Sequence, residues 1–531
     1  MGSVKKLSLA ILSGSLLGCA WFSPFTFLIF VGFVPLIVLT DEVSENAKRP
    51  KWTVFRYTYL SFLIWNVITT WWTWFASPGG CLFAVTVNAL IMSLVYLLFF
   101  ALYRAFKRSK FARFALWALI PVWLAFEYFH NNWELAWNWI ALGNVFSFQT
   151  KWIQWYEFTG VPGGSLWALI VNILIAKLVL FKNENLKFKI VRVVAVVVLP
   201  IAISLGIFAI TDEPLHEGGE QNVVVVQPNI DPYEEKFFIA YGTQLAQVYE
   251  QLKGKITDKT DYLVLPETFF TENIWENDIE SAYSVKFLRD SLLKKYPNLK
   301  IVTGASTLYK FQAGDVISAT ARKFSDADEY YESYNTGLQL DNFGPMQIYH
   351  KSKLVPGVER MPYPAFFKPL EKLTIDLGGT SGSLGIQDER TVFFNKDKSV
   401  GVAPVICYES VFGEYVTGYV KKGANLILVI TNDGWWRDSP GYRHHLNYAR
   451  LRAIETRRPI ARCANTGISC FIDVKGEMSK VTKWWEPAVI EASLTPNNEQ
   501  TFYVRFGDWI SRIASVFLLA AIPFAIFMNR K

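Results

Sequence analysis

Charged side chains are scarce in this sequence. They make up 19% of its 531 residues, whereas 51% are hydrophobic and 16% aromatic. Soluble globular proteins carry about 25% charged residues, and a disordered chain would be more polar still, so disorder is excluded. Cysteine is scarce as well, with five residues. A small scaffold held together by disulfides is therefore also excluded.

The hydrophobic residues are unevenly distributed along the chain. They crowd into residues 7–210, return at 509–528, and leave a long stretch of ordinary composition between. A helix needs about 20 apolar residues to cross the hydrocarbon core of a bilayer. The apolar runs predict eight membrane-spanning helices, at Leu7–Phe22, Phe25–Leu39, Val54–Phe75, Phe83–Tyr103, Ala115–Phe129, Ser165–Phe181, Ile190–Ile210 and Trp509–Phe527. The first two runs are short and broken at Ser23-Pro24, so they form either two full spans or one hairpin.

Positive charge orients these spans, because lysine and arginine near span ends stay on the cytoplasmic side. With eight spans and an inside N-terminus, the inner segments hold Lys5, Lys6, Lys48, Arg49, Lys51, Arg104, Lys107, Arg108, Lys110, Arg113, Lys182, Lys187, Lys189, Arg192, Arg530 and Lys531. The short outer loops hold only Lys151. We therefore expect seven helices in residues 1–211, an extracytoplasmic domain in 212–507, and the eighth helix with a cytoplasmic C-terminus in 508–531.

The basic character of the chain has the same origin. A net charge of +7 and an isoelectric point near 8.9 would suit a protein that binds nucleic acid. The surplus, however, lies in the inner segments just named, and the remaining residues are net negative. The charge is a topology signal, and we predict a lipid bilayer as partner and no nucleic acid.

The segment 212–507 is predicted to form an α/β domain. Short β-branched runs predict strands at Asn222–Gln227, Tyr262–Leu265, Lys300–Thr303, Gly337–Leu340, Val400–Ile406, Asn425–Ile430, Pro459–Cys463 and Cys470–Val474. Helix-like segments lie between several of them, at Lys236–Leu252, Ile279–Lys295 and His445–Arg457. This alternation favours a layered α/β fold over an all-β sandwich.

Cys407 differs from the other four cysteines. Cys19 and Cys81 lie in or beside the apolar runs, and Cys463 and Cys470 lie in strand-like segments, as core residues do. Cys407 instead directly follows the strand predicted at 400–406. Reactive groups in open α/β domains are presented at the carboxyl ends of strands, so Cys407 is a candidate nucleophile.

Two other polar residues occupy equivalent positions. Glu267 follows the apolar segment 263–266, and Lys351 follows the segment 346–350. Each alone has a simple structural explanation, as a solvated strand end or as cover for a sheet edge. With Cys407 they form a chemically useful set. A thiol needs a base to take its proton and a cation to hold the negative charge that forms on an attacked carbonyl.

The sequence around these three residues resembles a known family. Glu267 lies in Leu-Pro-Glu-Thr, Lys351 in Tyr-His-Lys-Ser-Lys-Leu-Val-Pro, and Cys407 in Ile-Cys-Tyr-Glu-Ser, in the order of the three nitrilase-superfamily motifs. Further matching stretches are Gln227-Pro228-Asn229-Ile230, Thr431-Asn432-Asp433-Gly434-Trp435, and residues 449–455 with Arg458-Pro459. With seven predicted spans before the domain and one after it, the chain resembles the apolipoprotein N-acyltransferase family.

The resemblance implies an αββα nitrilase-like fold and a ping-pong reaction. Glu267 would be the general base toward Cys407, whose thiolate would attack a phospholipid ester, by the family's preference that of phosphatidylethanolamine. Lys351 would steady the oxyanion. The α-amine of an S-diacylglyceryl-cysteine lipoprotein would then take the acyl chain from the thioester, the last step of lipoprotein maturation. Such an enzyme lies in the bacterial inner membrane with its catalytic domain on the periplasmic face.

Three further residues are expected to support this site by the same resemblance. Glu359 matches a glutamate thought to support the lysine, although the family commonly reads Phe-Gly-Glu where this chain has Gly357-Val358-Glu359. Tyr408 and Glu409 follow the nucleophile as in the family, where both affect activity. Glu409 either orients Lys351 or the incoming amine, or is a satisfied structural carboxylate.

No cofactor or metal is expected. His444-His445 resembles half of a metal site, but no acidic or cysteine partner lies at ligand spacing, so we predict a pair on a helix surface. The glycine-rich residues 377–382 lack the lysine and helix of a phosphate-binding loop, and we predict an outer loop there.

Two alternatives remain open. A membrane-tethered nitrilase-like amidase or hydrolase would use the same three residues with water in place of the amine, although eight spans favour a lipid donor. A transporter with a ligand-binding outer domain would more often show polar residues or Gly/Pro breaks in paired central spans, and these are not evident.

Overall fold

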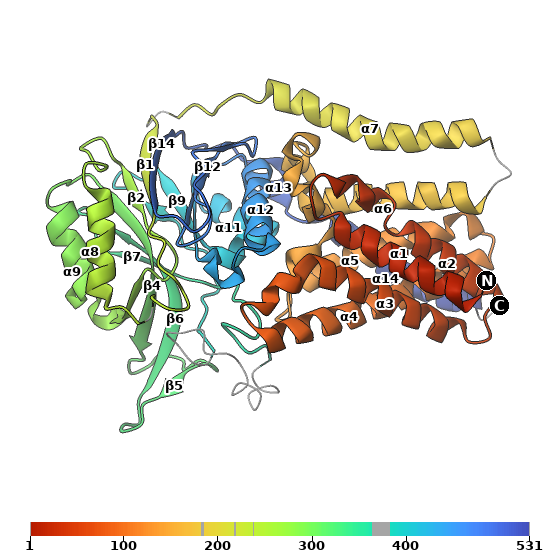
Figure 1. Cartoon of the computed structure of the whole chain (residues 1–531), viewed down its shortest axis with the longest axis horizontal. Coiled ribbons are helices and arrows are strands. Elements are labelled where there is room, and N and C mark those ends of the chain that lie inside the picture. The colour runs from red at the N-terminus through yellow and green to blue at the C-terminus, as the bar shows by residue number, and fades with distance from the viewer. Residues whose placement is uncertain (1, 182–184, 217–218, 237, 364–382, 530–531) are drawn as a thin grey trace. The chain divides into compact units, whose positions relative to one another are not determined.

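The computed structural model describes the chain except residues 1, 182–184, 217–218, 237, 364–382 and 530–531 (Figure 1). The described chain divides into two compact units. One is helical and contains residues 1–74, 78–210 and 506–531; the other contains residues 75–77 and 211–505. The short segment 75–77, which connects two long helices, thus groups with the second unit.

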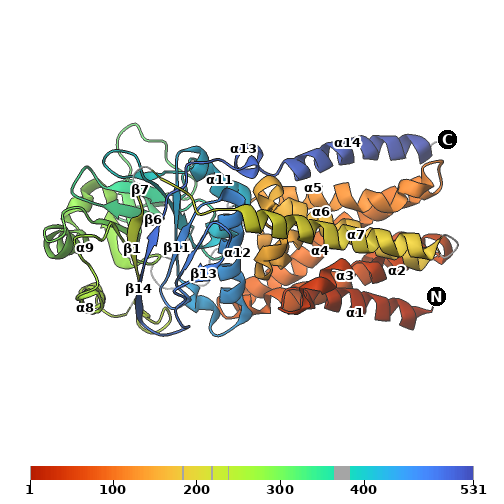
Figure 2. The same ribbon diagram turned by 90° about the horizontal axis from the view of Figure 1, so that it is seen from above.

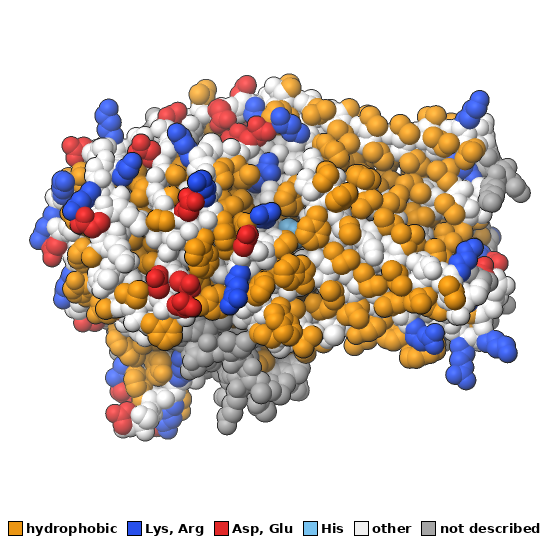
Figure 3. All heavy atoms as spheres, in the orientation of Figure 1, with side chains coloured by type: hydrophobic (Ala, Val, Ile, Leu, Met, Phe, Trp, Pro, Cys, Tyr) orange, Lys and Arg blue, Asp and Glu red, His pale blue; other side chains and the backbone are white. Residues whose placement is uncertain are grey.

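The first unit is a set of long helices that run side by side (Figure 2). Its α-helices are α1 (Ser3–Cys19), α2 (Val34–Asn46), α3 (Pro50–Thr70), α4 (Pro78–Lys107), α5 (Leu119–Asn131), α6 (Tyr156–Leu180), α7 (Leu186–Ile210) and α14 (Trp509–Asn529). A 3-10 turn at Phe25–Phe30 precedes α2, and another at Ala112–Ala118 precedes α5. Hydrophobic side chains cover most of the visible face of these helices (Figure 3).

Six helical stretches in the described residues are long and apolar enough to span a membrane, namely Phe25–Asn46, Pro78–Lys107, Ala112–Asn131, Tyr156–Leu180, Leu186–Ile210 and Trp509–Phe527. The helices α1 and α3 occupy the other two predicted positions but are not among the six; α1 has 17 residues. The predicted span at 54–75 also extended too far, since α3 ends at Thr70 and a 3-10 turn follows at Trp71–Trp74.

The second unit contains two sheets. The first has the order β14-β1-β2-β4-β6-β5, with β3 beside β4 and β7 beside β6; the second has the order β13-β12-β11-β10-β9-β8. The strands of the first sheet are β1 (Gln221–Gln227), β2 (Tyr262–Val264), β3 (Phe270–Trp275), β4 (Lys300–Lys310), β5 (Arg322–Lys323), β6 (Tyr330–Leu340), β7 (Gln347–His350) and β14 (Ala488–Leu494). Those of the second are β8 (Phe393–Phe394), β9 (Gly401–Ile406), β10 (Leu426–Thr431), β11 (Ile460–Ala464), β12 (Cys470–Ile472) and β13 (Met478–Ser479).

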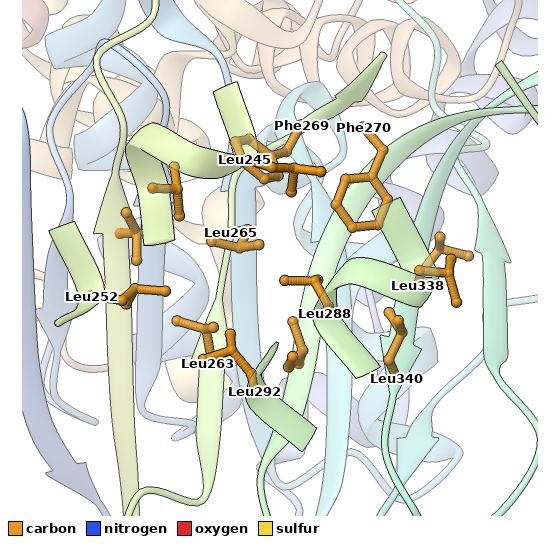
Figure 4. Close-up of a cluster of buried hydrophobic side chains, with 14 of the residues drawn as sticks. Leu245, Leu252, Leu263, Leu265, Phe269, Phe270, Leu288, Leu292, Leu338 and Leu340 are labelled. Atoms are coloured by element: carbon orange, nitrogen blue, oxygen red, sulfur yellow. The ribbon is translucent and has the colours of Figure 1, made fainter. Parts of the chain in front are cut away.

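Helices cover the outer face of each sheet. The helices α8 (Tyr241–Leu252) and α9 (Tyr283–Leu288) pack leucines such as Leu252 and Leu288 onto Leu263 and Leu340 of the first sheet (Figure 4). The helices α11 (Gly413–Lys421) and α12 (Pro440–Thr456) cover the second sheet. The inner faces meet where Gly337 lies against Pro404 and Ile406. The predicted αββα arrangement is confirmed.

The eight predicted strands all have a counterpart, within one or two residues at most ends. All three predicted helices were wrong in part. The helix predicted from Lys236 begins only at Tyr241, and the one predicted at 279–295 is divided into a 3-10 turn, α9 and a π-turn at Arg289–Leu293. The helix α12 begins before its predicted start at His445, because Pro440 and the Ser439 cap begin it earlier. The short strands β3, β5, β8 and β13, and also β14, were not predicted, and β7 was implied only by the strand-end position of Lys351.

Candidate active site

Cys407 opens a tight turn at the end of β9. It is the first residue of the 3-10 turn Cys407–Val411 and has φ +48°. A left-handed conformation costs a residue with a side chain about 1–3 kcal/mol and persists only when the surroundings hold it. Its side chain is nearly buried, with 8% exposure. The strand β9 therefore ends in a sharp, held turn at this cysteine, a backbone feature that α/β enzymes also use at the end of a strand.

Glu267 lies just beyond β2, and Gly304 of β4 makes room for it. A β-carbon on Gly304 would lie 2.4 Å from the Thr268 amide nitrogen and 2.6 Å from the Glu267 α-carbon. The Glu267 Oε2 accepts a hydrogen bond from the Asn432 amide at 3.1 Å. Glu267 is 6% exposed. Because Gly304 has no side chain, the backbone of Glu267 can lie close to β4.

Lys351 joins two carboxylates. It follows β7, and its Nζ donates to Glu267 Oε1 at 2.9 Å and to Glu359 Oε1 at 2.8 Å. Asn335 of β6 donates to the same two oxygens, at 2.8 and 3.1 Å. The lysine side chain is 1% exposed. The structure thus brings together Glu267, Lys351 and Glu359, which lie 84 and 8 positions apart in sequence.

The charges in this cluster determine where its protons reside. Burial would raise the pKa of Glu267, but the charge and hydrogen bond of Lys351 and the Asn335 amide hold it below its usual value. Burial would lower the pKa of Lys351, yet Glu267 and Glu359 raise it well above its usual value. Burial and the Glu267 carboxylate raise the pKa of the Cys407 thiol, against the charge of Lys351. The resting site therefore holds an ionised Glu267, a charged Lys351 and a neutral thiol.

Glu359 also shapes the loop that carries Lys351. Its Oε2 accepts a hydrogen bond from the Val355 amide at 2.7 Å. The altered Gly357-Val358 sequence places Gly357 at φ +75°, which suits a glycine. The carboxylate therefore contacts Lys351 even though the loop sequence departs from the family's.

Glu409 is a buried carboxylate with several hydrogen-bond donors. It accepts hydrogen bonds from the Tyr349 hydroxyl at 2.5 Å and from the Ser352 and Ile406 amides at 2.8 and 2.9 Å. The side chain does not hydrogen-bond Lys351 in any contact that the described residues show; it fixes the backbone on either side of it. Burial raises its pKa. Tyr408 is buried too and packs edge-on against Phe412, with ring centroids 5.0 Å apart.

Sequence reasoning missed two residues of this site. Asn335 lies within a long strand, where no strand-end signal marks it. Lys236 was predicted to begin a helix, but it lies in an irregular segment before it. Its Nζ donates to the Glu267 carbonyl at 3.0 Å and to Thr268 Oγ1 at 2.5 Å. Burial lowers the pKa of Lys236 to about 8, although Glu267 and Cys407 act to raise it.

The histidine pair was also misplaced. His444 and His445 are 2% and 0% exposed, not on a helix surface. The prediction was wrong because α12 packs against the turn after Cys407, and because the acidic partner, Asp433, comes from the preceding turn and not from the helix itself. Among the described residues no group of three or more potential metal-ligating side chains occurs. The glycine-rich residues 377–382 lie outside the described residues.

Two family models match the chain. Residues 223–502 match the carbon-nitrogen hydrolase model, and residues 13–174 match the model of the apolipoprotein N-acyltransferase N-terminal domain. The apolipoprotein N-acyltransferase of Chlorobaculum tepidum is 31% identical over 96% of this chain and 94% of its own length. That of Geobacter metallireducens is 26% identical over 97% of this chain and 95% of its own.

The chain is also similar to solved structures that cover about half of it. Nit3 of Saccharomyces cerevisiae, a member of branch 10 of the nitrilase superfamily, covers 52% of this chain and 91% of its own, with a TM-score of 0.37 and 18% identity. An amidase from Nesterenkonia sp. covers 53% of this chain and 93% of its own, with a TM-score of 0.36 and 14% identity.

Proposed function

Since the chain belongs to the apolipoprotein N-acyltransferase family, we propose that it moves an acyl chain from a phospholipid to the α-amine of the S-diacylglyceryl-cysteine of lipoproteins. The acyl chain passes through a thioester on Cys407. The observation that carries this mechanism is the buried contact of Lys351 with Glu267 and Glu359, next to a thiol held at a strand end.

In the first half-reaction Glu267 takes the proton of the Cys407 thiol as the sulfur attacks the ester carbonyl carbon of the phospholipid. The base is needed because burial and the Glu267 charge raise the pKa of the thiol. The negative charge moves to the ester oxygen, where the Lys351 ammonium stabilises it. The intermediate collapses, the ester bond breaks, and the lysophospholipid leaves with the proton from Glu267.

In the second half-reaction the lipoprotein amine attacks the thioester carbonyl. Glu267 takes a proton from the attacking nitrogen, the carbon–sulfur bond breaks, and Cys407 leaves as a thiolate that regains its proton. One ester and one amine are consumed, and one amide and one lysophospholipid are formed. A thioester suits the exchange because a thiolate is a better leaving group than the alkoxide of an ester.

Lys236 adds a second buried positive charge to this mechanism. Its bonds to the Glu267 carbonyl and to Thr268 Oγ1 hold the backbone that carries the base. Its charge also favours the ionised form of Glu267. In our proposal Lys351 contacts the reacting atoms, whereas Lys236 acts through Glu267.

The membrane location follows the family and the six apolar helices. We infer that the donor is phosphatidylethanolamine, that the protein lies in the bacterial inner membrane, and that the α/β unit faces the periplasm. The concentration of lysine and arginine in the segments between alternate helices supports this orientation. A membrane-tethered amidase would use the same three residues, but the match of residues 13–174 to the acyltransferase N-terminal domain favours acyl transfer.

The test is a mass shift on an acceptor peptide. Purified protein in detergent receives phosphatidylethanolamine and a synthetic diacylglyceryl-cysteine peptide, with the Cys407→Ala variant in parallel. We expect one acyl chain on the peptide amine with the wild-type protein and none with the variant. Release of free fatty acid or ammonia without peptide acylation, lost in Cys407→Ala, would instead establish the hydrolase.

A further inference from the structure

Behind the Cys407 turn lies a second buried cluster, formed by Asp433, His445 and Arg462. All three side chains are 0% exposed. They come from three elements: Asp433 follows β10, His445 lies in α12, and Arg462 lies in β11. The mechanism above uses none of them.

One edge of the His445 ring faces the nucleophile's backbone. Its Nε2 lies 3.0 Å from the carbonyl oxygen of Cys407 and 2.9 Å from the Ser410 hydroxyl. The Ser410 hydroxyl donates to the same carbonyl oxygen at 2.7 Å. A carbonyl oxygen can only accept, so Nε2 carries the proton in this contact.

The other edge of the His445 ring contacts two charged side chains. Its Nδ1 lies 2.9 Å from Asp433 Oδ1 and 3.1 Å from Arg462 Nη2, and the guanidinium bonds Asp433 Oδ2 at 2.6 Å. The Thr431 hydroxyl donates to Asp433 Oδ1 at 2.9 Å. Contacts on both edges prevent the imidazole from rotating, so it presents Nε2 to Cys407 in one orientation.

We propose that His445 is a positioning residue for Cys407: its Nε2, together with the Ser410 hydroxyl, holds the Cys407 carbonyl and so maintains the left-handed turn that aims the thiol. The peptide unit is planar and trans. A fixed carbonyl therefore fixes the orientation of the whole Cys407–Tyr408 peptide, with its N–H pointing the opposite way. This assignment rests on the proposed function, because it takes Cys407 as the nucleophile.

Two substitutions separate the two edges of the ring. In His445→Gln the side-chain amide nitrogen takes the place of Nε2, so the contact with the Cys407 carbonyl is kept and that with Asp433 is lost. In His445→Asn the amide nitrogen takes the place of Nδ1, so the Asp433 contact is kept and the carbonyl contact is lost. The rate of acyl-enzyme formation is measured by intact mass in the full-length protein with phosphatidylethanolamine, and the unfolding temperature of each variant is measured alongside.

We expect His445→Gln to form the acyl-enzyme within about fivefold of the wild-type rate and His445→Asn to be about 100-fold slower, the cost of a nucleophile misplaced by about 1 Å. The stability order should be the reverse, because His445→Gln loses the ionic partner. The more stable variant would then be the slower one. A merely structural histidine would give the same order for rate and stability, and that result, or equal rates in the two variants, would overturn the proposal.

Two further measurements keep the proposal testable. If the wild-type protein forms no acyl-enzyme, the proposed function fails. The positioning of Cys407 is then tested by its alkylation rate with iodoacetamide, which should again be slower in His445→Asn than in His445→Gln. If a His445 variant does not fold, Ser410→Ala removes the other donor to the same oxygen with a smaller change in volume. An acylation or alkylation rate about tenfold lower in Ser410→Ala supports the shared anchor, and an unchanged rate overturns it.

Discussion

Two buried clusters of charged residues lie near Cys407, and they differ in the part of the site that they contact. The first, Lys351 with Glu267 and Glu359, contains the groups that, in the proposed mechanism, exchange protons and charge with the substrate. The second, Asp433 with His445 and Arg462, contacts the carbonyl behind the thiol. Buried ion pairs contribute little net stability, so two such pairs around one cysteine indicate a functional arrangement. Loss of the first cluster should slow the chemistry most, and loss of the second should lower stability and misplace the Cys407 backbone.

The largest effect is expected for Lys351→Met. It removes the cation from the site of the developing oxyanion, and acyl-enzyme formation should fall about 10³-fold, near the cost of one oxyanion donor. The measurement is single-turnover acylation by phospholipid, read by intact mass. Lys353→Met is the matched control, because that side chain lies over the Phe412 ring at 4.9 Å. A slow Lys353→Met beside an active Lys351→Met would contradict the assignment.

The second cluster is broken by Arg462→Met. The change leaves Asp433 buried without its guanidinium partner, and the free energy of unfolding should fall by about 3–5 kcal/mol. Thermal unfolding in detergent measures it. The control is Arg443→Met, where the arginine side chain is 63% exposed and 3.9 Å from Asp438, a pair worth at most about 1 kcal/mol. Equal losses in the two variants would show that the buried Arg462 pair stabilises the fold no more than an exposed pair does.

Gly304→Ala tests how closely Glu267 must approach. The added β-carbon would lie 2.6 Å from the Glu267 α-carbon, so the base shifts and acylation slows by about 100-fold. Gly337→Ala is a matched control in the neighbouring strand, because its nearest contact is 3.5 Å. We expect single-turnover rates near wild type for Gly337→Ala. A wild-type rate in Gly304→Ala would show that Glu267 tolerates displacement.

The smallest effect is expected for Lys236→Met, at about tenfold in acylation rate, or about 1.4 kcal/mol. Because burial lowers the pKa of Lys236 to about 8, its charge is present below that pH and lost above it. The wild-type acylation rate should therefore decline as pH rises through about 8, and Lys236→Met should lack this decline. Lys353 has a pKa also lowered to about 8 by burial and by Arg390. If the decline persisted in Lys236→Met and disappeared in Lys353→Met, Lys353 and not Lys236 would be responsible for it.

Lys236 also affects stability with pH in a definite sense. Its folded pKa lies below its unfolded value of about 10.4, so between these values the unfolded chain binds more protons and folding is favoured as pH rises. As pH rises above about 8, Lys236 should therefore make the folded protein more stable while the acylation rate falls. A rate that fell together with stability above pH 8 would point to unfolding and not to Lys236.

The sequence predicted the first cluster better than the second for a physical reason. Glu267, Lys351 and Cys407 each end a hydrophobic strand, and strand ends are visible as a change from apolar to polar residues. Asn335 lies inside β6 and leaves no such mark. His445 lies on a helix that is buried on almost every side. Its polar residues are buried too, but in the sequence they look like those of a solvent-exposed helix face.

The same reasoning explains the errors in the fold. The central strands were predictable because they are continuous apolar runs. The helix predicted from Lys236 began too early because the polar segment 231–240 has an ambiguous pattern and its lysine turns inward to bond the Glu267 backbone. The edge strands β5, β8 and β13 have two residues each, too few for an alternation to be seen. Their pairing depends on partners that are distant in sequence.

The central claim is a thioester on Cys407, and the mass of the protein itself tests it most directly. Full-length protein is incubated with phosphatidylethanolamine without acceptor, digested, and the acylated peptide is identified. We predict one acyl chain on the peptide that contains Cys407, absent in Glu267→Gln and removed when the diacylglyceryl-cysteine peptide is added, with the chain recovered on its amine. An acyl chain on another residue, or peptide acylation by Cys407→Ala, would contradict the account.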